Sequence, residues 1–182
     1  MNSRRVPSQT IMSEKRRKMK TIEDIHSELA LSAWKTTIER ADRLFLSLTP
    51  EEATEEVAPG RNRLIYLLGH LTATHDRMLD LLGLGERLQP KFDELFLSKP
   101  DKTTELPPFD TVRSAWVEVN RTVSEGIASF SSADWLRKHA AVSDEDFAKD
   151  PLRNRLAILL SRTNHLAYHL GQAALVRRSA GV

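Results

Sequence analysis

Two histidines near the carboxyl end of the chain have the spacing of metal ligands. His165 and His169 are four residues apart in a stretch, residues 164–172, that reads Asn-His-Leu-Ala-Tyr-His-Leu-Gly-Gln. In an α-helix, residues four apart project from one face, so both imidazoles can reach the same ion. A zinc-like site needs at least a third protein ligand. Because the chain contains no cysteine, nitrogen and oxygen atoms must supply every ligand.

The sequence around this pair predicts a long last helix. Asp150 is a suitable N-cap, and Pro151 suits the first helical position. The two histidines lie on nearly the opposite side of this helix from its apolar band. Their position argues against ordinary core histidines, and it fits two solvated residues on an outward face equally well. The band consists of Leu156, Leu159, Leu160, Thr163, Leu166, Ala167, Leu170 and Ala174.

A third ligand can come from a second amphipathic segment, predicted as a helix over about residues 61–82 and ended by Gly83 and Gly85. It contains His70 and His75. These two residues point about 140° away from each other, so only one of them can serve a given site. His75 falls at the centre of the apolar stripe and His70 on its flank. Periodicity therefore favours His75 as the inward residue, while a hydrogen-bonded helix histidine explains either one.

Two further long helices complete the pattern. Thr21 and Asp24 resemble a capping box before a helix that extends to about residue 48, and Asp110 caps a helix with apolar residues every three or four positions. Residues 84–109 contain four prolines and form a long connection, and residues 131–150 form a second one. A connection as long as the first often lies over a functional mouth, but we interpret it as a surface crossover. The sequence predicts an all-α four-helix bundle with a long crossover between helices 2 and 3.

Composition indicates one globular domain with a basic extension. The 182 residues are 40% hydrophobic and 29% charged, with seven glycines. Residues 1–20 carry seven lysines and arginines against Glu14, a net +6, so the remainder of this chain of net charge +2 sums to −4. We interpret residues 1–20 as a flexible basic extension and residues 21–182 as the bundle domain. Nucleic-acid binding would depend on the extension alone, so we do not expect a nucleic-acid partner.

Targeting signals are not evident. No apolar run approaches the roughly 18 residues that a membrane span needs. The N-terminus lacks the apolar segment of a secretory signal, despite the Arg4-Arg5 pair. We expect a cytoplasmic protein without a membrane partner.

Two segments together resemble the DinB/YfiT-like superfamily of metal-dependent enzymes. Residues 62–71, which read Asn-Arg-Leu-Ile-Tyr-Leu-Leu-Gly-His-Leu, are similar to the family's second-helix pattern, which ends in His-Leu. Residues 164–172 are similar to its last-helix His-x-x-x-His motif. Helix lengths and the long crossover also fit, so the resemblance covers about residues 22–178.

The resemblance implies a four-helix bundle that holds a divalent metal ion, often nickel or zinc, on three histidines. Carried over residue by residue, these ligands are His70, His165 and His169. The resemblance thus favours His70 over the residue that periodicity prefers, and His75 remains the rival third ligand.

Such a site has definite chemistry. Three neutral imidazoles leave a bound ion its full charge and at least one position open to water or substrate. The ion lowers the pKa of a bound water or thiol and thereby supplies a nucleophile. Gln172 and Asn62 are candidates, by helical position, to accept the other N–H of a ligand ring. No acidic residue lies within a turn of either half of the site on the same face, so the catalytic residues stay unassigned.

The sequence therefore predicts a metal-dependent transferase or hydrolase that acts on a small molecule. Transfer of a low-molecular-weight thiol to an electrophile is the specific form that similar family members suggest. The alternative is a non-catalytic metal-binding module, or one that dimerises through an apolar helix face. We expect a homodimer.

Overall fold

The computed structural model describes residues 19–179, with side chains to residue 176. These residues are helical, with no β-strand among them, which confirms the predicted all-α class. The predicted extension, residues 1–20, lies almost entirely outside the described residues. None of the helices between residues 19 and 179 combines the length and apolar character that a membrane span requires. The elements are α1 (Ile22–Phe45), η1 (Glu52–Thr54), α2 (Leu64–Leu82), η2 (Glu94–Ser98), α3 (Phe109–Ile127), α4 (Ser132–Trp135), α5 (Asp144–Lys149) and α6 (Arg155–Ser179).

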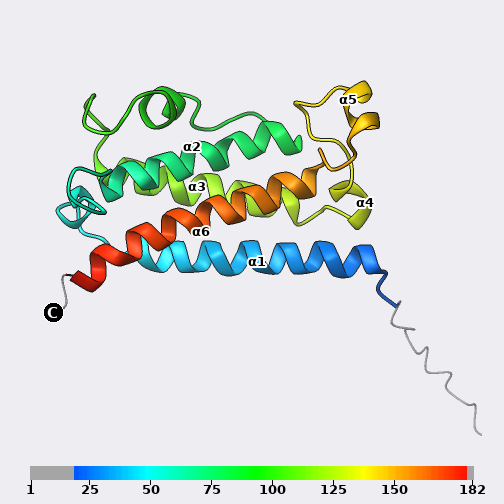
Figure 1. Ribbon diagram of the computed structural model, residues 1–182, viewed down its shortest axis with the longest axis horizontal. Coiled ribbons are helices and arrows are strands. Elements are labelled where there is room, and N and C mark those ends of the chain that lie inside the picture. Colours follow the sequence, from blue (N-terminus) through cyan, green and yellow to red (C-terminus); the bar gives the residue numbers. More distant parts are fainter. Residues whose placement is uncertain (1–18, 180–182) are drawn as a thin grey trace, which may run out of the picture.

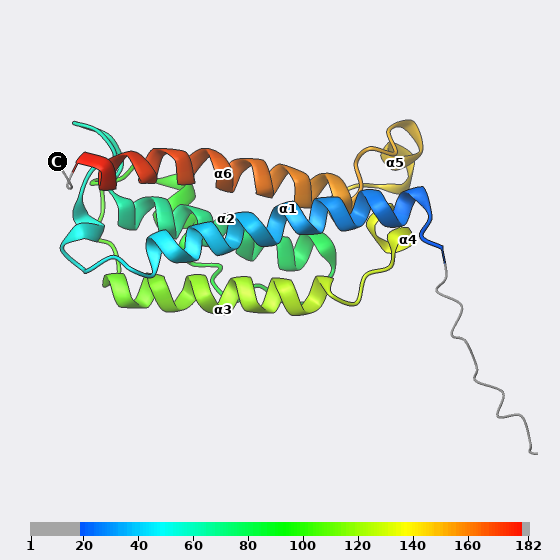
Figure 2. The same ribbon diagram turned by 90° about the horizontal axis from the view of Figure 1, so that it is seen from below.

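The four long helices lie side by side as a bundle (Figures 1 and 2). Helix α2 packs against both α3 and α6, and α1 packs against α6. Figure 1 shows that α2 and α3 run in the same direction, opposite to α1 and α6. Two consecutive parallel helices require the chain to return along the bundle. Residues 83–108 make this return, pass over α2 and carry the π-helix η2.

Helix α2 is the central helix, since nearly all of its side chains are buried. Apolar side chains surround it in two clusters, one towards each end of the bundle. Both histidines of α2 are therefore covered, His75 completely and His70 in part. The largest fully buried side chains are Phe45, Phe96 and Trp116 in the first cluster and Trp34 and Trp135 in the second.

The helix ends follow local chemistry, which the sequence predicts well at two positions. The capping box at the start of α1 is confirmed, because the Asp24 backbone N–H donates to Thr21 Oγ1 at 3.1 Å and the Thr21 N–H donates to the Asp24 carboxylate at 3.0 Å. Gly83 ends α2 as predicted, with φ of 70°, a left-handed conformation that glycine adopts without strain.

Two predicted caps are wrong. Helix α3 begins at Phe109 after Pro108, so Asp110 lies in its first turn and does not cap it. Helix α6 begins at Arg155, after Asn154, whose side-chain oxygen accepts from the Ala157 backbone N–H at 2.9 Å. Asp150 instead accepts from the Leu152 N–H at 3.1 Å in the preceding turn. Both residue types suit turns as well as caps, so composition did not distinguish the two roles.

The buried face of α6 is rotated relative to the predicted apolar band. Leu159 and Leu166 are buried as expected, but Leu160 is 44% exposed, and Ala167 and Ala174 are also exposed. Helix α6 carries apolar side chains around much of its circumference, so the positions of α1 and α2 decide which of them are covered. The rotation moves the two α6 histidines from the predicted outward side to the flank of the buried face.

Candidate metal centre

Three imidazoles from two helices converge on one point. His70 Nε2 on α2 lies 3.0 Å from His165 Nε2 on α6, and His169 Nε2 lies 3.1 Å from the same atom. Metal–nitrogen bonds of about 2.0–2.1 Å place neighbouring ligand nitrogens roughly 3.0–3.4 Å apart in octahedral or tetrahedral sites. The three residues thus form a group that could hold one metal ion.

Hydrogen bonds fix the orientation of two of these rings. His70 Nδ1 lies 2.9 Å from the backbone carbonyl oxygen of Phe96, and His169 Nδ1 lies 2.7 Å from Oε1 of Gln172. The Gln172 amide nitrogen donates to the Tyr168 hydroxyl at 3.1 Å, which is consistent with its oxygen facing the ring. A carbonyl oxygen only accepts, so Nδ1 donates in both contacts and each Nε2 keeps its lone pair. Both lone pairs face His165, and facing lone pairs need a cation or a proton between them.

The three rings are neutral at neutral pH. Burial lowers the pKa of His70 and of His169 below the ordinary value. Burial, followed by the proximity of His169 and His70, lowers the pKa of His165 to about 4. Neutral imidazole is the form that binds metals. The donor set therefore fits a divalent ion that accepts nitrogen ligands.

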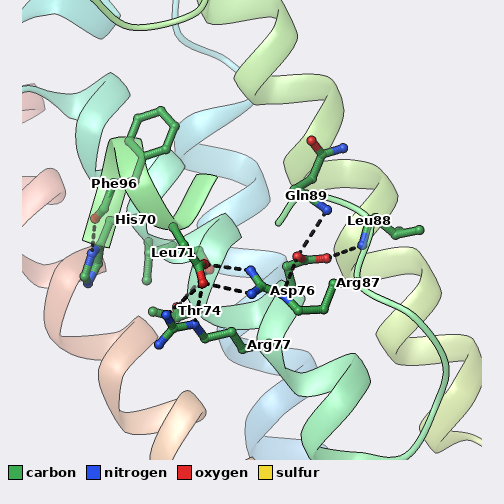
Figure 3. Close-up of polar contacts among 10 residues, drawn as sticks. His70, Leu71, Thr74, Asp76, Arg77, Arg87, Leu88, Gln89 and Phe96 are labelled. Carbon is green, nitrogen blue, oxygen red and sulfur yellow. Dashed lines mark hydrogen bonds and ion pairs between the residues drawn. The ribbon is translucent and has the colours of Figure 1, made fainter. Parts of the chain in front are cut away.

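The crossover supplies the partner of His70. Phe96 lies in η2, and its buried ring packs on α2 at Gly69, where an added Cβ would come within 2.2 Å of the ring. Figure 3 shows the Phe96 carbonyl directed at the His70 ring. The sequence favours a surface crossover here over a connection that lies above a functional mouth. A backbone carbonyl leaves no signal in the residue types, so this contact could not be found from the sequence.

A network of ion pairs holds the crossover on α2 (Figure 3). Asp76, fully buried, accepts from the backbone N–H groups of Leu88 at 2.7 Å and Gln89 at 3.1 Å, and from Arg87. Arg87 also binds Asp93, which lies just before η2. Asp93 accepts a further hydrogen bond from Arg77 on α2. These contacts fix both ends of the segment that precedes the Phe96 carbonyl.

His75 does not join the group. It is fully buried, and its Nδ1 lies 2.8 Å from Oδ1 of Asn120 on α3. Its ring lies near Trp34 and Trp116, with centroid distances of 4.9 and 5.2 Å. Burial lowers the pKa of His75 to about 3. Periodicity therefore identified an inward residue correctly, but that residue faces α1 and α3 instead of α6.

A cavity of about 630 Å³ adjoins the histidine group at His169. Its lining combines amide and cationic side chains with apolar ones, and no aspartate or glutamate of the described residues is part of it. Of the two predicted partners of the ligand rings, Gln172 reaches His169, while Asn62 lines the cavity and makes no hydrogen bond to a ring among the described residues. The lining residues are Val57, Ala58, Arg61, Asn62, Leu67, Tyr168, His169, Gln172 and Leu175.

Comparison with known families agrees with this geometry. A family model described as the DinB superfamily matches residues 33–173. The match extends from α1 into α6 and includes all three histidines of the group. No curated protein matches the chain significantly.

Proposed function

The chain belongs to the DinB superfamily, and from this premise we propose that His70, His165 and His169 bind one divalent metal ion, zinc or nickel. We further propose that the bound ion serves an enzyme that transfers a low-molecular-weight thiol to a small electrophile. The observation that carries the proposal is the convergence of three neutral imidazoles, whose Nε2 atoms lie 3.0 and 3.1 Å apart. Two of these rings are held by hydrogen bonds that their Nδ1 atoms donate.

The residues of the chain would each have a defined role. Phe96 and Gln172 hold the His70 and His169 rings in the tautomer that presents Nε2. The cavity beside His169 would hold the organic part of the substrates against apolar and amide groups. A divalent ion on three neutral ligands is a Lewis acid that lowers the pKa of a thiol or water bound to it.

Thiol transfer is favoured over hydrolysis because the described part of the site contains no acidic side chain. Metal-dependent hydrolysis by peptidase-like enzymes uses a glutamate beside the ion as general base. No carboxylate of the described residues lines the cavity or joins the histidine group. A thiol has an ordinary pKa of about 8.5 and needs a smaller shift than water, at about 15.7, to ionise near neutral pH. A thiol therefore requires less assistance from a base.

Metal analysis of protein purified without a histidine tag tests the metal site. We expect one divalent ion per chain in the unmodified protein and less than a tenth of that in His70→Ala, because one of three ligands is lost. His26→Ala is the matched control, since His26 is an exposed histidine on α1. A His70→Ala protein that retains the full metal content would refute the proposal.

Turnover tests the reaction. The metal-loaded protein should conjugate an electrophile such as monochlorobimane to glutathione-, mycothiol- or bacillithiol-type thiols faster than the uncatalysed rate, and His70→Ala should not. Equal rates with and without the loaded protein for every thiol would remove the transferase proposal and leave the metal site standing.

One observation favours the non-catalytic alternative. The outward face of α6 exposes Leu160, Tyr168 and Leu175, at 44%, 64% and 61%, and such a face could form a homodimer. In that case the metal would be structural. A Co(II) spectrum that indicates four protein ligands and does not change when a thiol is added would support this alternative, and sedimentation equilibrium would report the dimer.

A further inference from the structure

One arginine beside the histidine group has no acidic partner in the part of the chain that the structure describes. Arg162 is three residues before His165 on α6, so both side chains project from the same face of the helix. Its side chain is partly buried, and its Nε is enclosed without a hydrogen-bond partner. Among the described residues, no carboxylate forms an ion pair with it. The side chain is thus held next to the candidate metal centre with its charge unmatched.

The acidic side chains near Arg162 are held by other arginines. Burial, followed by the nearby guanidinium of Arg77, lowers the pKa of Arg162. Arg77 itself is neutralised, since it donates to Asp93. The acids of α2 and the crossover in this region are therefore already engaged, which leaves Arg162 without a counterion among the described residues.

An unpaired and partly buried guanidinium is costly, because it gives up hydration without gaining a partner. Its planar donors match the oxygens of a carboxylate, and charge-assisted hydrogen bonds of this kind are stronger than neutral ones. No hydrogen bond or ion pair of the described residues engages its terminal nitrogens, so these donors remain for a ligand. A ligand oxygen at this position would satisfy the charge that the protein leaves open.

We propose that Arg162 binds a carboxylate of the molecule that occupies the open position of the metal centre. The inference rests on the proposed metal site and adds a class of substrate to it: a carboxylate-bearing thiol is selected over a neutral thiol of the same size. Arg162 is then a specificity residue, and the metal ligands remain the three histidines.

Two thiols with the same two-carbon spacer, one ending in a carboxylate and the other in a hydroxyl, test this selection. The full chain is loaded with Co(II), and the thiolate-to-cobalt absorption is titrated with 3-mercaptopropionate and with 2-mercaptoethanol. We expect the unmodified protein to bind 3-mercaptopropionate about tenfold more tightly, as a charged hydrogen bond at a partly exposed site provides. Arg162→Gln should bind both thiols equally, with the affinity for 2-mercaptoethanol unchanged within twofold.

Further variants keep the result decisive. Arg121→Gln removes an exposed arginine of α3 and should preserve the tenfold preference. Arg162→Lys keeps the charge without the planar donors and should retain a smaller preference of about threefold; it also serves if Arg162→Gln does not fold.

Equal affinity of the unmodified protein for the two thiols would overturn the inference while Co(II) binding sustains the metal site. Loss of the preference in Arg61→Gln and not in Arg162→Gln would assign the carboxylate to the cavity arginine instead. Failure to bind Co(II) at all would refute the underlying metal proposal.

Discussion

At the residue scale, the three imidazoles differ in what holds them. A main-chain carbonyl fixes His70, and a side-chain amide fixes His169. Nδ1 of His165 is buried without a partner among the described residues. A ligand whose second nitrogen has an acceptor is held in one tautomer and is more basic. The two fixed rings therefore contribute preorganisation, and His165 adapts to them.

Gln172 offers a direct test of this role. Replacing Gln172 by Ala removes the acceptor of the His169 N–H and should weaken metal binding about tenfold. Gln172→Glu retains an acceptor oxygen and should bind at least as tightly as the unmodified protein. Competition with a chromophoric chelator measures both affinities. An unchanged affinity in Gln172→Ala would show that the hydrogen bond does not support the site.

His75 makes folding stability depend on pH. Its pKa is about 3 in the folded chain and about 6.5 when unfolded, so the unfolded state binds the proton first. The stability from the neutral buried ring is present above pH 6.5 and is lost as the pH falls below it. The histidine group acts in the same direction, since each of its pKa values is also lowered.

The variant His75→Gln isolates this contribution. Between pH 7 and pH 5, in the presence of a chelator, the free energy of unfolding of the unmodified protein should fall by about 2 kcal/mol more than that of the variant. Urea denaturation at each pH provides the values. The comparison cancels the other histidines, because both proteins retain them. An equal fall in both proteins would contradict the assigned pKa of His75.

At the element scale, the contact between α2 and η2 matters most for the site. Gly69 lets the Phe96 ring lie directly on α2. The backbone carbonyl of Phe96 reaches His70, the next residue of the helix. The crossover is thus part of the centre, although it contributes no ligand.

Gly69→Ala should disturb this contact. The new Cβ would overlap the buried Phe96 ring, and overpacking of this kind costs about 1–3 kcal/mol. Gly171→Ala on α6 is the matched control, because a Cβ there meets no atom within 4 Å. That substitution should stabilise the protein by up to about 1 kcal/mol through helix propensity. Urea denaturation compares the two, and equal stabilities would contradict the close approach.

At the scale of the whole molecule, the proposed ion would join two helices that are far apart in the chain. His70 lies in the second long helix and the other two ligands lie in the last. A ligand that binds only the folded state stabilises it by mass action. Metal binding should therefore raise the free energy of unfolding of the whole domain.

Removal of the metal should lower the melting temperature. At a free metal concentration one hundred times Kd, binding contributes about 2.7 kcal/mol, which corresponds to roughly 5–10 °C for a domain of this size. Calorimetry before and after EDTA, and after zinc is restored, measures the shift. His70→Ala should show no such response. An unmodified protein whose melting temperature is the same with EDTA and with zinc would contradict a bridging ion.

The sequence by itself determined the local features of this protein. The capping box at Thr21 and the glycine at position 83 were predicted correctly because caps depend on residues within one turn. The spacing of His165 and His169 placed both rings on one face for the same reason. The absence of cysteine limited any metal site to nitrogen and oxygen ligands.

Tertiary structure alone decided how the helices are rotated and what lies between them. Residue patterns on α2 favoured His75, and only the positions of α3 and α6 show that His75 meets Asn120 while His70 meets the α6 histidines. The buried residues of α6 are not all those of its predicted apolar band. The partner of His70 is the main-chain carbonyl of Phe96, which residue types do not reveal. Helix formation depends on interactions within a few residues, whereas rotation and contact depend on the shapes of side chains that are distant in the chain.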